Sequence, residues 1–102
     1  MVLETTKRIQ ALEREDSDRL VANGEGAHGI TLLRGLMKQP VVMAKDVAKI
    51  VGVSYTKANS LISVCEELKI LRQISHGKRN RKFIYDSYVA ILSEGTEMRT
   101  NS

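Results

Sequence analysis

The chain lacks several features on which whole classes of protein depend. It has a single cysteine, Cys65, and only two histidines, His28 and His76. One thiol forms no internal disulfide, and these three side chains offer no zinc-ligand spacing, so we expect neither a disulfide nor a bound metal. No apolar run approaches the roughly 18 residues of a membrane-spanning helix. The start, MVLETTKRIQ, has no basic segment followed by a short apolar stretch, which predicts no secretory signal and a cytoplasmic location.

Residues that interrupt or stiffen a chain are also scarce. Tryptophan is absent and proline occurs once, at Pro40, which favours helices. The length of 102 residues suffices for about one small domain. Hydrophobic residues make up 42% and charged residues 27%, which is typical of an ordinary globular domain and excludes a disordered or membrane-spanning chain.

Negative charge is scarce in the second part of the chain. Residues 29–102 carry twelve Lys and Arg against six Asp and Glu, whereas residues 1–28 carry four against six. An excess of cations on one part of a protein is typical of surfaces that bind polyanions, above all nucleic acids. Solubility explains the same excess equally well, so charge alone leaves both interpretations open.

Hydrophobic spacing predicts a polar helix ahead of the basic part. Between residues 3 and 22 sparse apolar side chains recur at helical spacing, and Gly24 marks the end of the helix. The solvated face of this helix is predicted to carry the acidic cluster Glu13, Glu15, Asp16 and Asp18. We therefore divide the chain into a connector helix with a glycine-rich link, 1–28, a domain, 29–95, and a flexible tail, 96–102.

Three further helices are expected inside the domain. Apolar residues at steps of three and four predict helices at about 29–39, 45–51 and 55–68. Gly52 and Ser54 stand between the last two helices, as a glycine that ends one and an N-cap that begins the next. This spacing predicts a helix, a tight turn and a second helix.

A β-hairpin and a closing helix complete the domain. Two β-capable stretches, 72–75 and 82–85, flank a basic loop that contains Gly77, and a last short helix is expected to end at Gly95. Three helices, a hairpin and a closing helix follow each other in this order in winged helix-turn-helix domains. The predicted fold class is therefore mainly α with a small β-hairpin (α+β), a winged helix-turn-helix preceded by an N-terminal helix.

The third domain helix and the hairpin loop carry the residues predicted to bind DNA. The outward face of the helix is small and polar, which allows it to enter a major groove and bond base edges. Asn59 is the best single candidate for a base contact, because its amide can pair with adenine at two points. The loop places four cations within five residues, where phosphates or a minor groove would lie. The predicted DNA-binding residues are Ser54, Tyr55, Thr56, Lys57, Asn59, Ser60, Ser63, Lys78, Arg79, Arg81 and Lys82.

Other residues have a plainer structural interpretation. Cys65 lies in the apolar arc of its helix and is predicted to be a buried, inert thiol. His28 is expected to be an exposed loop residue, and His76 either a turn residue or a phosphate contact. Tyr85 and Tyr88 are predicted to pack the hairpin against the core rather than to stack on bases. The loop cations also suit a solvated hairpin tip.

Six short segments stand in an order that is typical of one family. They are QPVV, DVA, GVSYTKA, EELKIL, GKRNRKF and YVAIL. In this order they resemble the C-terminal winged-helix region of Fic-family (filamentation induced by cAMP) proteins. The KRIQALERE helix resembles the connector behind the Fic catalytic core, so the resemblance covers about residues 5–95. Met43 and Asn59 depart from the family, which often has a small hydroxyl residue and a basic residue there.

The resemblance implies two functions of different kinds. The first is a DNA-binding, transcription regulator-like module, and the alternative is a protein-interaction or dimerisation domain of a Fic-family enzyme with no DNA binding. Fic-family enzymes transfer AMP from ATP to a protein hydroxyl through an HPFxxGNGR-type motif, which this chain lacks. We therefore expect no enzymatic activity and no cofactor. The expected partners are double-stranded DNA, a second copy of the chain and an upstream Fic domain, with no membrane.

Overall fold

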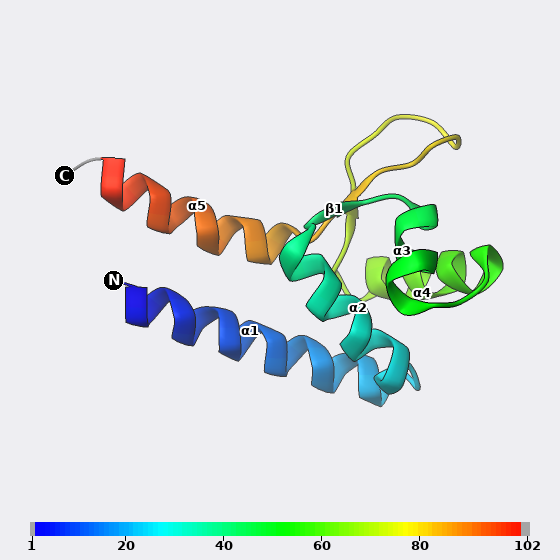
Figure 1. The fold of residues 1–102 in the computed structure, drawn as a ribbon, viewed down its shortest axis with the longest axis horizontal. Coiled ribbons are helices and arrows are strands. Elements are labelled where there is room, and N and C mark those ends of the chain that lie inside the picture. Colours follow the sequence, from blue (N-terminus) through cyan, green and yellow to red (C-terminus); the bar gives the residue numbers. More distant parts are fainter. Residues whose placement is uncertain (1, 101–102) are drawn as a thin grey trace.

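A computed structural model describes residues 2–100 of the chain and the side chains of residues 4–94. The elements are α1 (Val2–Ala22), α2 (Gly26–Lys38), β1 (Val41–Val42), α3 (Ala44–Val51), α4 (Tyr55–Glu67), β2 (Arg72–Gln73), β3 (Phe83–Ile84) and α5 (Asp86–Thr100). In the described residues the chain is mainly helical with one small antiparallel sheet (Figure 1). The predicted α+β class is confirmed, with a helix-turn-helix of α3 and α4. The wing is β2, β3 and the loop between them, residues 72–84.

The sheet joins the wing to the start of the helix-turn-helix. β3 lies in the centre, with β1 on one side and β2 on the other. Val42 pairs with Phe83, and Arg72 pairs with Ile84, both in antiparallel register. The sequence predicted only an extended stretch at β1. Its pairing with β3 brings the first turn of α3 next to the base of the wing.

One hydrophobic core lies between the helices and the sheet. Its fully buried side chains come from α1, α2, α3, α4 and β3 and from Tyr85 after β3, namely Leu20, Leu32, Leu33, Leu36, Val47, Leu61, Ile62, Phe83 and Tyr85. Burial of each such side chain stabilises the fold by about 1.5–3 kcal/mol. Cys65 is buried in the same core, as predicted, and desolvation raises the pKa of its thiol from 9.0 to about 12.

The turn between α3 and α4 forms as the sequence predicted. Gly52 has a φ of 79°, a left-handed conformation that other residues adopt only with strain, and its amide donates to the Ala48 carbonyl at 2.8 Å. Ser54 then begins α4, because its Oγ accepts from the amide of Lys57 at 3.1 Å. These two contacts end α3 and begin α4, so they define the turn between the two helices.

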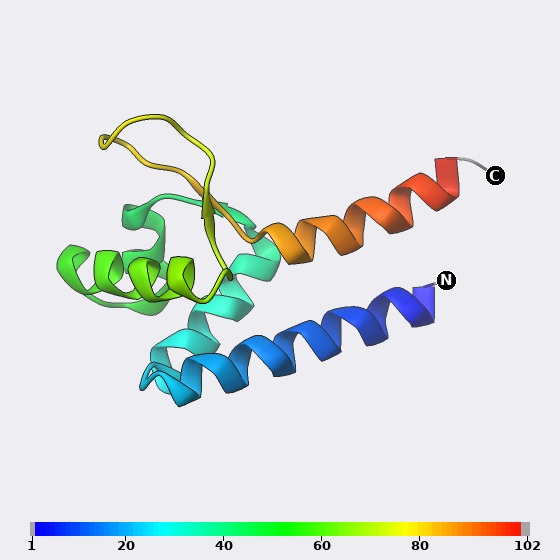
Figure 2. The same ribbon diagram turned by 180° about the vertical axis from the view of Figure 1, so that it is seen from behind.

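The two terminal helices, α1 and α5, run antiparallel and side by side (Figures 1 and 2). Arg8 on α1 and Glu94 on α5 form an ion pair between them. Both chain ends therefore lie at one end of the molecule, while α4 and the wing lie at the other (Figure 2). Across the part of the chain that the structure describes, we find no helix with the length and apolar character needed to cross a membrane.

One acidic residue of α1 is buried, against prediction. Asp16 is only 2% exposed, so its assignment to a solvated face is wrong. Its Oδ2 accepts from the Tyr85 hydroxyl at 2.6 Å, and its Oδ1 accepts from Arg19 Nη1 at 3.1 Å. A buried carboxylate is tolerated when it is paired and hydrogen-bonded in this way.

Both tyrosines that follow the wing pack it against the core, as predicted. Tyr85 is fully buried, and Tyr88 is half-buried with its hydroxyl donating to the Met37 carbonyl at 2.9 Å. Their rings stack with centroids 5.8 Å apart. The wing is thereby fixed to α1 through Tyr85 and to α2 through Tyr88.

Two predicted helix boundaries are wrong, the first of which is the start of α2. α2 begins at Gly26, so the link is only residues 23–25, and His28 is a half-buried helix residue rather than an exposed loop residue. Gly24 does form the turn, with a φ of 77°, whereas Gly26 and Gly29 allow close packing, since a Cβ there would lie 3.0 Å from Val21 Cγ2 and 2.8 Å from Leu20 Cδ1, respectively.

The closing helix α5 also exceeds its predicted length. It continues through Gly95 to Thr100, whereas the prediction ended it at Gly95. A glycine inside a helix costs about 1 kcal/mol, so Gly95 did not suffice to end this helix, which lies along α1. The flexible tail was predicted at 96–102, and its last two residues, 101–102, lie outside the described residues.

Candidate nucleic-acid interface

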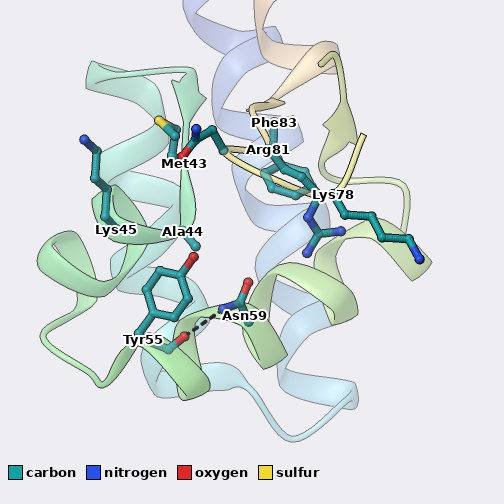
Figure 3. A pocket seen from close by; sticks show the side chains of 9 residues that line it. Met43, Ala44, Lys45, Tyr55, Asn59, Lys78, Arg81 and Phe83 are labelled. Atoms are coloured by element: carbon teal, nitrogen blue, oxygen red, sulfur yellow. Dashed lines mark hydrogen bonds between the residues drawn. The ribbon is translucent and has the colours of Figure 1, made fainter. Parts of the chain in front are cut away.

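An open hollow of about 410 Å³ lies between the first turn of α3, the start of α4 and the wing (Figure 3). Its lining residues are Met43, Ala44, Lys45, Tyr55, Asn59, Lys78, Asn80, Arg81 and Phe83. The volume lies in the range of about 300–1,000 Å³ that small-ligand sites occupy, but such sites are mostly apolar. This lining contains three cations and no acidic side chain. The hollow therefore suits an anionic partner.

The α3 side of the hollow is built without a hydroxyl cap. Met43 is the N-cap residue, and its side chain makes no capping hydrogen bond. The Asp46 carboxylate instead accepts from the Met43 amide at 2.8 Å. Lys45 follows in the first turn and is exposed at the rim. The Asp46 carboxylate offsets the partial positive charge of this helix N-terminus, so the positive charge on this side of the hollow is that of Lys45.

The α4 side contributes two hydrogen-bonding groups. Tyr55 is 63% exposed, and Figure 3 shows its ring at the edge of the hollow with the hydroxyl pointing toward the start of α3. Asn59 is half-buried, and its Nδ2 donates to the Tyr55 carbonyl at 3.2 Å. Pairing with adenine needs both amide atoms. The predicted base contact of Asn59 therefore requires this intrahelical bond to be exchanged.

Side-chain bonds give the wing loop a defined shape. Gln73 Nε2 donates to the carbonyls of Ser75 and Gly77, both at 3.0 Å. The Lys82 amide donates to Ser75 Oγ at 2.9 Å, which closes the base of the loop. Gly77 has a φ of 83° and turns the chain at the tip, beside the exposed His76. These hydrogen bonds therefore hold the loop that carries the wing cations in one conformation.

The cations of the wing differ in how they are held. The guanidinium carbon of Arg81 lies 5.2 Å from the centre of the Phe83 ring, a cation–π contact that directs the half-buried arginine to the hollow. Lys78, Arg79 and Lys82 are exposed and form no ion pair with other described residues. Their charges are consequently available to an anionic partner.

The predicted site residues fall into distinct groups. Those that meet at the hollow are Tyr55, Asn59, Lys78 and Arg81. Those exposed elsewhere on α4 or on the wing are Thr56, Ser60, Ser63, Arg79 and Lys82. Ser54 is exposed as well, with its oxygen engaged as the cap of α4.

Lys57 is separated from the other predicted site residues. Its Nζ lies 3.2 Å and 3.5 Å from the two carboxylate oxygens of Glu25, which stands just before α2. The sequence had placed Lys57 among the exposed DNA-binding residues, but it is half-buried and paired. No local pattern could indicate this contact, because 32 residues separate the partners.

Two charged or polar lining residues, Lys45 and Asn80, were missing from the predicted site, besides the apolar Met43, Ala44 and Phe83. The sequence does not mark Lys45 as a site residue, because the pairing of β1 with β3 that brings it to the wing is not visible there. Asn80 lies among the four cations of the wing loop, between Arg79 and Arg81. It has a φ of 51°, a conformation that asparagine tolerates better than most residues, which is the one signal that marked it as a turn position.

Comparison with known proteins identifies no relative. No family model, curated protein or solved structure matches the chain. The resemblance to the Fic-family winged-helix region therefore stays a prediction, and function has to be inferred from the hollow and from the exposed cations around it.

Proposed function

We propose that the chain is a winged-helix DNA-binding module of the transcription regulator-like kind, acting in the cytoplasm. In this proposal the outward face of α4 enters the major groove and the wing lies on the sugar-phosphate backbone. It assigns no catalytic step to the chain and no cofactor. The Fic-family resemblance is consistent with it, as an appended regulatory domain.

One observation carries the proposal, namely the convergence of Lys45, Lys78 and Arg81 on a hollow that also contains Tyr55 and Asn59. Duplex DNA presents phosphates, which attract cations, and base edges, which form hydrogen bonds. Cations and hydrogen-bonding side chains on neighbouring surfaces of the chain match both. The outward face of α4 adds small hydroxyl side chains at Thr56, Ser60 and Ser63, which leave room for the groove.

The test compares two triple variants of equal charge. One replaces Lys45, Lys78 and Arg81 with alanine, and the control replaces Lys7, Arg34 and Lys38, which are exposed outside the hollow. Binding to a random-sequence duplex of about 20 base pairs is followed by fluorescence anisotropy at about 50 mM and about 200 mM salt.

The wild type is expected to bind with a slope of log K against log salt of about −4 to −5. Loss of three phosphate contacts should bring the slope of the hollow variant to about −2, while the control stays near the wild type. Absence of wild-type binding at low salt contradicts the proposal. Equal losses of affinity in the two variants contradict the proposal as well, because the change in net charge alone would then explain the weaker binding.

A protein-interaction or dimerisation domain is the second candidate. The observation that favours it is the antiparallel pair of α1 and α5, which extends away from the hollow and is joined by Arg8 and Glu94 (Figure 2). A second copy or an upstream Fic domain would attach at that end. A concentration-dependent dimer in sedimentation equilibrium, together with no DNA binding, supports this candidate over the first.

A further inference from the structure

The ion pair of Glu25 and Lys57 lies on the flank of α4 that faces away from the hollow. Residues two positions apart on a helix are separated by about 200° around its axis, so Lys57 and Asn59 occupy different flanks. Asn59 lines the hollow, whereas Lys57 is held at the beginning of α2. The exposed face between these flanks carries Thr56 and Ser60.

The geometry holds the carboxylate firmly in place. The side chain of Glu25 is only 14% exposed, and both of its oxygens lie within 3.5 Å of Lys57 Nζ. Glu25 also stands immediately before α2, where the positive end of the helix dipole favours a negative charge. The lysine side chain is 38% exposed, so its charge lies near the surface but already has a partner.

We propose that Glu25 is a selectivity residue that keeps Lys57 from contacting DNA phosphates. The inference rests on the proposed function and deepens it. With Lys57 neutralised, the early turns of α4 present hydrogen-bonding groups and no free cation to the groove. Phosphate contacts attract DNA of any sequence, while base contacts discriminate. Glu25 therefore lowers non-specific affinity and leaves discrimination to the polar face of α4.

The test is a double-mutant cycle on random-sequence duplex DNA. It uses Glu25→Gln, Lys57→Gln and the two changes together, with Glu15→Gln as a control that removes an exposed carboxylate from α1. Glu25→Ala is a second variant, and circular dichroism checks that each protein is folded. Affinity is measured across a range of salt concentrations by anisotropy.

Release of one cation should make Glu25→Gln bind about five- to tenfold more tightly near 0.1 M salt, with a salt slope steeper by about 0.9. Lys57→Gln alone should change affinity by less than about twofold, because the charge that it removes is already paired. In the Lys57→Gln background, Glu25→Gln should tighten binding no more than Glu15→Gln does.

Three results would overturn the inference, and they differ in whether the proposed function is overturned with it. If the wild type binds and Glu25→Gln and Glu25→Ala leave affinity unchanged, only the inference is wrong. If Lys57→Gln and the double variant both weaken binding about fivefold or more, Lys57 already contacts DNA, and the proposed function stands without the inference. If neither the wild type nor any folded variant binds at low salt, the proposed function is wrong and the inference falls with it.

Discussion

At the scale of single residues, Asp16 joins the first helix to the segment that follows the wing. Its bond to Tyr85 spans the core, and Arg19 occupies its other oxygen. Burial, and after it the bond to Asp16, raises the pKa of the Tyr85 phenol above its ordinary 10.0. The phenol therefore remains a hydrogen-bond donor at every physiological pH, which keeps the buried carboxylate satisfied.

Replacement of Tyr85 with phenylalanine tests this contact. The change removes the only hydroxyl that bonds Asp16 among the described residues and leaves the carboxylate under-bonded, which should lower the free energy of unfolding by about 1.5–3 kcal/mol. Tyr88→Phe removes a bond to a neutral carbonyl and should cost about 0.5–1.5 kcal/mol. Urea unfolding measures both, and an equal or smaller loss for Tyr85→Phe would refute the account.

Cys65 provides a second test at this scale. Desolvation first, and then the charge of Asp16, raise the pKa of its thiol from 9.0 to about 12. The folded chain holds this proton where the unfolded chain releases it, so the contribution of the thiol to stability is complete below pH 9.0 and declines from there to about pH 12. A disulfide reagent such as DTNB should label Cys65 at about pH 8 only after urea unfolds the chain. Rapid labelling of the folded protein contradicts this burial.

At the scale of the elements, patterns among residues close in sequence predicted α4 and the wing. Contacts between different segments of the folded chain account for the start of α2 and the burial of Asp16, which those patterns did not predict. Gly52 and Ser54 act only on their neighbours in sequence, which is why the turn before α4 could be predicted. Gly26 was predicted to lie in the link but begins α2, because a glycine that breaks a helix and one that admits a neighbouring helix look alike in sequence. The burial of Asp16 depends on Tyr85, 69 residues away, and no periodicity reveals it.

Gly29→Ala tests the close approach of α1 and α2. The added Cβ would lie 2.8 Å from Leu20 Cδ1 and 2.9 Å from Leu20 Cβ, so the helices must shift apart. We expect a loss of about 1–3 kcal/mol in the free energy of unfolding, although alanine favours helices. Thr31→Ala, on the exposed face of α2, should change it by no more than about 0.5 kcal/mol. A stabilised Gly29→Ala protein would show that the two helices tolerate the extra atom.

At the scale of the whole molecule, α3, α4 and the wing lie at one end, and the paired terminal helices extend toward the other (Figure 1). The exposed wing cations and the residues that line the hollow belong to the first end. The wing cations could be predicted because all four lie within five residues of the sequence. Lys45 could not, since its place at the hollow depends on the pairing of β1 with β3. The same limit applies to Lys57, which only the folded chain brings to Glu25.

The most direct measurement of the central claim is an NMR titration of the ¹⁵N-labelled chain with a short random-sequence duplex. The account predicts that amide shifts concentrate at Lys45, in α4 from Tyr55 to Ser63 and in the wing loop at 76–82, while α1 and α5 remain unchanged. Shifts confined to α1 and α5 would contradict the account and favour an interaction domain, and a spectrum that does not change at low salt would contradict DNA binding altogether.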